Sequence, residues 1–171
     1  MLDWTHVRRE LSAWGSDMVN QAGTTYNLVK VFDISKWSDY YFPFYSVFVD
    51  SEQAKVFPTE DAYPNTINTG FGIDPIDEST IDVWIYAGFE CESSNDDESN
   101  YDDAAEQCIN EVVMKYRGYQ PLVYEDVNYY TLFEPLNILG ATRMITNENL
   151  TKGAIAVKCQ IKSTRHFKDL M

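Results

Sequence analysis

The segment 153–164 alternates between apolar and polar positions, which is the period of a half-buried β-strand. One face carries Ile155, Val157, Cys159 and Ile161, and the other carries Lys158, Gln160, Lys162 and Thr164. Because only a short basic tail follows this strand, we expect its sheet partners upstream.

Two segments have the period of amphipathic helices. The first is predicted from an N-cap at Asp3 to a C-cap at Gly23, with both of its tryptophans in the core. The second is predicted from Asp102 or Asp103 to Gly118, with Ala105, Cys108, Ile109, Val112, Val113 and Tyr116 on its apolar face. The basic residues of its last turn interact favourably with the helix dipole.

Other segments are typical of strands. Strands are predicted at 26–33, 42–49, 80–90, 122–133 (broken around 125–128) and 141–146, the last forming a hairpin with the terminal strand. The predicted fold class is α+β, a single domain in which both helices pack against a mixed or antiparallel sheet.

Residues 50–79 have no period and form an unusually long connection for a compact domain. They are too apolar and aromatic for a plain linker, so we expect an extended arm or long hairpin that packs on another surface. Phe57, Tyr63 and Phe71 are its candidate interface residues.

Composition adds charge to this picture. The chain has 171 residues and a net charge of −14, which argues against binding nucleic acid through a broad positive face. Residues 1–151 carry a net −18, and the end of the chain carries +4. Its basic residues Lys158, Lys162, Arg165 and Lys168 are the candidate subunit or partner interface. A solvated surface explains the same charges, and the aromatic content of 15% fits either a core or an interface.

Candidate chemistry is sparse. His6 and His166 lie near opposite ends of the chain and are interpreted as surface residues. Cys91, Cys108 and Cys159 lack zinc spacing, and the acidic run 95–103 fits no EF-hand loop. We expect no catalytic residue, cofactor or metal site. Without a signal peptide or an apolar span, the sequence predicts an intracellular soluble protein with reduced thiols and no membrane partner.

The order of elements resembles that of the tail terminator proteins of long-tailed bacteriophages. The resemblance is carried by the leading amphipathic helix, Phe42-Pro43 before a strand, the strand 81–89 feeding the helix 103–117, and the final strand 154–164. The segments 50–79 and 126–150 are longer than the compact pattern of that family.

The resemblance implies a non-enzymatic virion protein that forms a ring of six copies at the head-proximal end of the tail tube. Such a ring stops tube growth and joins the tail to the head connector, while DNA passes through the lumen without specific binding. Its partners are then further copies of itself, the tail tube protein and the neck proteins. The alternatives are another head-completion or connector protein, an acidic DNA-mimicking module acting through 90–106, and a small hydrolase with an acid pair.

Overall fold

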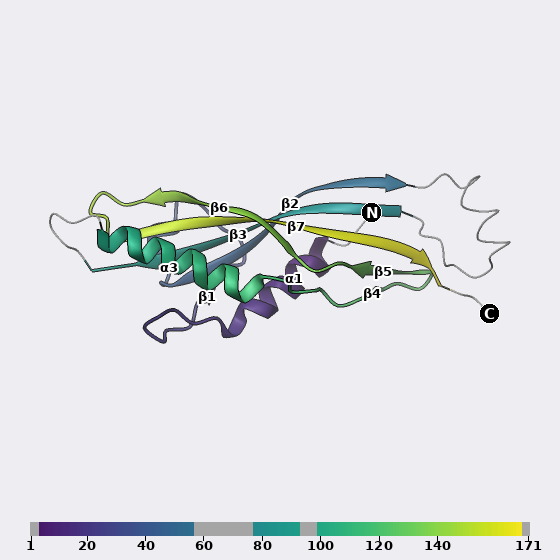
Figure 1. Ribbon diagram of the computed structural model, residues 1–171, viewed down its shortest axis with the longest axis horizontal. Coiled ribbons are helices and arrows are strands. Elements are labelled where there is room, and N and C mark those ends of the chain that lie inside the picture. Colours follow the sequence, from purple (N-terminus) through teal and green to yellow (C-terminus); the bar gives the residue numbers. More distant parts are fainter. Residues whose placement is uncertain (1–3, 57–76, 93–98, 169–171) are drawn as a thin grey trace.

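The computed structural model describes residues 4–56, 77–92 and 99–168 and has an α+β fold (Figure 1). In this part of the chain, two α-helices pack against a seven-stranded mixed sheet. The elements are α1 (Trp4–Trp14), β1 (Asn27–Leu28), β2 (Phe44–Val56), β3 (Asp77–Glu90), α3 (Ser99–Tyr116), β4 (Tyr124–Glu125), β5 (Tyr129–Phe133), β6 (Asn137–Thr146) and β7 (Lys152–Phe167). The predicted fold class is confirmed.

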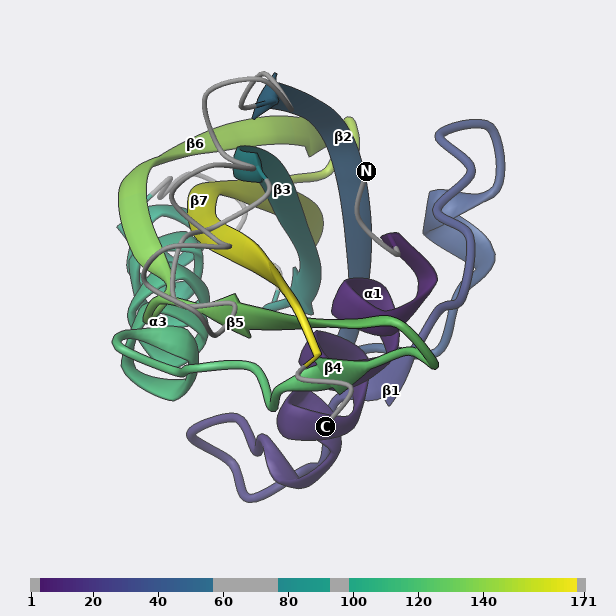
Figure 2. The same ribbon diagram turned by 90° about the vertical axis from the view of Figure 1, so that its right-hand side faces the viewer.

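The terminal strand β7 is the centre of the sheet. It pairs with β3 along its length, from Asp77↔Arg165 to Glu90↔Lys152. Its other side pairs with β6 along the first half and with β5 along the second half. The predicted hairpin with residues 141–146 is therefore confirmed. Figure 2 shows that the sheet is curled, with β4 and β5 turned away from the plane of β2 and β3.

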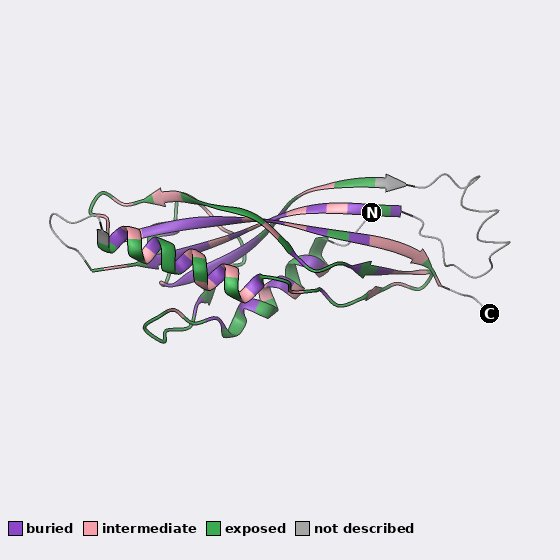
Figure 3. Ribbon diagram, in the orientation of Figure 1, coloured by how far each residue is buried: buried purple, intermediate pink, exposed green. Residues whose placement is uncertain are grey.

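The main core lies between the inner face of the sheet and the two helices (Figure 3). Alternation puts one face of β3 and β7 in this core, including Ile85 and Val157, both fully buried. Of the apolar face predicted for α3, Ala105, Cys108, Val112 and Tyr116 are buried, while Ile109 and Val113 are half-buried. Gly118, with a φ of 72°, follows the end of α3 as predicted.

Helix α1 is shorter than predicted and ends at Trp14, followed by the 3₁₀ turn Gly15–Asp17. Two core tyrosines explain the early end: Tyr116 Oη donates to the Leu11 carbonyl at 2.7 Å, and Tyr45 Oη donates to the Ser12 carbonyl at 2.6 Å. Carbonyls of the last turn therefore find partners in the tertiary structure instead of a further helical turn.

Two further predictions about this region are corrected. Gly23 lies in a tight turn, where its amide donates to Asn20, and does not cap the helix. Trp4 and Trp14 are 40% and 41% exposed, so neither is a core residue. Trp14 lies over the end of α3, where its indole N–H donates to the Lys115 carbonyl at 2.7 Å.

The strand predicted at 26–33 is reduced to β1, which pairs with the start of β2 in parallel. The chain after β1 contributes to a second, smaller hydrophobic cluster, in which Trp37, Phe44 and Ala154 are buried. Phe44 packs on the bare backbone of Gly88, where a Cβ has no room. Aromatic packing thus competes with strand pairing for residues 29–43.

The segment 50–79 is in part a hairpin. β2 and β3 pair in antiparallel register from Phe44↔Gly88 to Val56↔Asp77, with one bulge between Val49 and Ser51. The candidate residues Phe57, Tyr63 and Phe71 lie outside the described residues. Both strands therefore extend to the point where residues 57–76 begin and end.

Candidate functional site

The basic residues predicted for an interface occupy different environments on β7 and just after it. Lys162 is exposed, and Lys158 is half-buried with its ammonium 5.7 Å from the centre of the Trp84 ring. Both belong to the outer face of the sheet, opposite the main core. These two lysines are the part of the predicted surface available to a partner.

Arg165 and Lys168 form ion pairs within the chain. Arg165 Nη2 pairs with the carboxylate of Asp77, whose side chain is only 2% exposed, and its guanidinium lies 4.8 Å from the centre of the Tyr129 ring. Lys168 Nζ lies 3.5 Å from Glu125 Oε2. The structure therefore splits the predicted basic surface and gives Arg165 a structural contact.

A groove of about 550 Å³ runs along β2. Its walls come from the start of α1, the segment 30–32, residues 46–49 of β2 and Tyr86 of β3. The charged residues that line it, Arg8 and Lys30, are both basic and both exposed. Its aromatic lining includes Phe48, which is 48% exposed.

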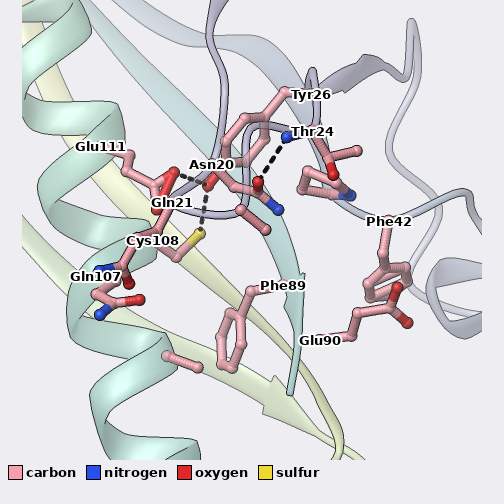
Figure 4. Close-up of a pocket in the computed structure, with 13 residues that line it drawn as sticks. Asn20, Gln21, Thr24, Tyr26, Phe42, Phe89, Glu90, Gln107, Cys108 and Glu111 are labelled. Carbon is pink, nitrogen blue, oxygen red and sulfur yellow. Dashed lines mark hydrogen bonds between the residues drawn. The ribbon is translucent and has the colours of Figure 1, made fainter. Parts of the chain in front are cut away.

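A second pocket, of about 530 Å³, lies between α3 and the turn at residues 20–26 (Figure 4). Tyr26 is buried there, and its hydroxyl donates to Glu111 Oε2 at 3.1 Å and lies 3.5 Å from Cys108 Sγ. Figure 4 shows these three side chains converging at one end of the pocket, while Glu90 and Phe42 lie at the other.

Burial dominates the proton affinities of this cluster. It raises the pKa of the Tyr26 phenol above its ordinary value and that of the Cys108 thiol to about 12. Burial also raises the pKa of Glu111, against the lowering effect of the hydrogen bond from Tyr26. The raised pKa values favour the protonated thiol and phenol, which are the less nucleophilic forms, and the contacts of Tyr26 tie the turn to α3.

We expect the stability of the Glu111→Gln variant to fall less than that of the wild type as the pH rises. An acid whose pKa is raised by folding contributes stability that is fully present below its unfolded pKa and is lost as pH rises through its folded pKa. For Glu111 this loss begins near the ordinary value of 4.5. Thermal melts of both proteins between pH 4 and pH 8 measure it; parallel curves would contradict the assignment.

The histidines, although distant in sequence, both pack on the β4–β5 hairpin. His6 stacks on Phe133 at 5.7 Å, and His166 stacks on Tyr130 at 5.2 Å. Neither is the surface histidine that the sequence suggested, because each ring is half-buried. Among the described residues, no group of three or more His, Cys, Asp or Glu side chains is arranged to hold a metal ion.

Of the acidic run, residues 95–98 lie outside the described residues, and Asp102 pairs with Arg143 at 2.5 Å. No helix in the described part of the chain is long and apolar enough to cross a membrane. The chain matches no protein-family model and no curated protein sequence. Its function is therefore inferred from its own residues.

Sequence reasoning missed the groove along β2. Arg8 and Lys30 are 22 positions apart in the sequence, in a helix and a connection, and no period links them. The available signal was the excess of acids elsewhere in the chain. In such a protein, a site whose charged residues are all basic is unusual.

Proposed function

We propose that this protein is a structural virion protein, a phage tail terminator that forms a ring at the head-proximal end of the tail tube. The ring stops tube growth and joins the tail to the head connector. The observation that carries the proposal is the hairpin of β2 and β3, to which we assign two different contact surfaces in one subunit. A closed ring of identical subunits uses a head-to-tail contact and needs such a pair of unlike surfaces.

The first surface is the far end of the hairpin, where residues 57–76 are attached. The second is the outer edge of β2. Beyond Tyr45, no described strand pairs with β2 on the side away from β3. An unpaired edge offers backbone N–H and C=O groups to an added strand.

The free edge at β6 suits pairing less well than the edge of β2. β6 is interrupted by bulges between Ile138 and Gly140 and between Arg143 and Ile145. Bulges twist an edge and interrupt its hydrogen-bonding pattern, which discourages the addition of a strand. The open edge of β2 is regular from residue 46 to the bulge at Val49.

The charge of the chain suits a passage for DNA. With a net charge of −14, a ring of these subunits repels the phosphate backbone at every point where its acidic surface faces the lumen. The outer-face lysines, half-buried Lys158 and exposed Lys162, are assigned to contacts with a neighbouring subunit or with the tail tube.

The mass of the purified protein in solution, combined with negative-stain images, tests the proposal. We expect rings of six copies, and capping of tail tubes when the protein is added during their assembly. A strict monomer that forms no rings even beside tail tubes would overturn the proposal. Rings of another copy number would favour a connector protein of the neck instead.

Reversing the charge of the outer face tests the role of its lysines. We expect Lys158→Glu with Lys162→Glu to give a folded monomer that no longer assembles, because both side chains lie outside the main core. Circular dichroism and sedimentation measure the two properties separately. Lys36→Glu with Arg117→Glu, an equal charge change at exposed positions, is the matched control. Assembly at the wild-type level would place the interface elsewhere.

A further inference from the structure

The groove along β2 combines two features of a site for an extended peptide. Residues 46–49 of β2 line it and belong to the edge that no described strand covers. Side chains from α1 and from the segment 30–32 supply its other walls. Backbone pairing with an open edge gives affinity to an added strand, and flanking side chains select its sequence.

The side chains that line the groove favour a peptide with acidic and aromatic residues. Arg8 and Lys30 are the charged lining residues, in a protein that otherwise carries a large excess of acids. Trp4, Phe32, Phe48 and Tyr86 provide aromatic surface. Two cations beside an aromatic wall complement a segment that contains carboxylates and aromatic rings.

We propose that residues 57–76 of a second copy of this chain occupy the groove and pair with the edge of β2. This inference rests on the proposed ring and names the contact that joins its subunits. The segment contains the acids Glu60, Asp61 and Asp74 and the aromatic residues Phe57, Tyr63 and Phe71, and it has no Lys or Arg.

The points of attachment favour a second copy over the segment's own subunit. Val56 pairs with Asp77, so the twenty residues between them leave and return at one place, the far end of the hairpin. The groove lies at residues 46–49, seven residues back from Val56, or about 23 Å along an extended strand. A half-length of ten residues spans about 33 Å, so an internal contact uses most of the segment in doubling back. A neighbouring subunit imposes no such reversal.

Site-specific photocrosslinking tests the contact directly. The probe is p-benzoylphenylalanine in place of Phe48, in full-length protein prepared as an equal mixture of ¹⁴N and ¹⁵N copies before assembly. We expect crosslinked peptides that join position 48 to residues 57–76 and include pairs of mixed isotope. If every crosslinked pair of peptides carries a single isotope, the segment occupies the groove of its own subunit, and the inference is overturned. Crosslinks to residues 1–3 or to another surface would also overturn it.

Charge reversal provides an independent readout. We expect Arg8→Glu with Lys30→Glu to lower the assembled fraction at least tenfold, and Glu60→Lys with Asp61→Lys to do the same. Combining all four substitutions should restore assembly, because the complementary charges are exchanged. Arg9→Glu with Lys36→Glu is the matched control, since both residues are exposed and neither lines the groove. Failure of the combined variant to recover, with each pair folded, would contradict the contact.

The two experiments separate this contact from the proposed function. If rings form without crosslinks between position 48 and residues 57–76, the proposed ring stands and the groove is excluded as the contact between its subunits. Mixed-isotope crosslinks in a protein that forms only dimers would support the contact and contradict the proposal that the protein is a tail terminator.

Discussion

Replacing Val157 with Asp is expected to abolish folding. Val157 is fully buried in β7, paired with Ile85 of β3 on one side and with Ala141 of β6 on the other. A carboxylate there enters the main core, and protonating it instead still leaves a polar group buried among apolar side chains. The cost is several kcal/mol, comparable to the whole stability of about 5–15 kcal/mol of a typical domain.

The measurement is a thermal or urea melt of the purified variant followed by circular dichroism. We expect no cooperative transition and a high sensitivity to proteolysis. Lys36→Asp, at an exposed position outside the assigned contact surfaces, is the control and should melt within about 1 kcal/mol of the wild type. A cooperative melt of Val157→Asp near that of the wild type would show that β7 is not the centre of the core.

Replacing Arg165 with Ala is expected to destabilise the fold by about 3–5 kcal/mol, the range for removing one partner of a buried ion pair. The reason is the carboxylate of Asp77, which is 2% exposed and pairs with Arg165 across the β3–β7 register. Without the guanidinium, this carboxylate loses its countercharge in a poorly solvated position. The substitution also removes the cation that lies against the Tyr129 ring.

Denaturant unfolding of three variants separates this effect from a general loss of charge. Lys168→Ala is the control: its partner Glu125 is 69% exposed, so we expect a change below about 1 kcal/mol. The double variant Asp77→Ala with Arg165→Ala should lose less stability than Arg165→Ala alone, because no buried charge remains. If the single Arg165→Ala variant keeps wild-type stability but fails to assemble, then Arg165 belongs to an interface.

Several local features of the fold could be predicted because local sequence controls them. The alternation around Val157 gives β7 its buried face, and Gly118 ends α3 at a positive φ. The break before Tyr129 and the hairpin between β6 and β7 follow from turn-forming residues. In each case a period or a turn signal within about ten residues is sufficient.

The candidate contact surfaces could be predicted only in part. The sequence identifies Lys158 and Lys162 as basic positions on the polar face of a strand, and the structure leaves Lys162 exposed. It cannot identify Asp77 as the partner of Arg165, because that pair is fixed by the register of two strands 88 residues apart. Nor can it assemble Arg8 and Lys30 beside the edge of β2.

By itself, the sequence determined the α+β class, the buried face of the terminal strand and the acidic character of the protein. The tertiary structure alone decided where α1 ends, since tyrosines from β2 and α3 cap its last carbonyls. It also decided which bases are engaged within the chain and that no described strand covers the edge of β2 beyond Tyr45. Periodicity and composition act over one turn or one strand, whereas register, capping by distant side chains and edge pairing depend on which segments meet.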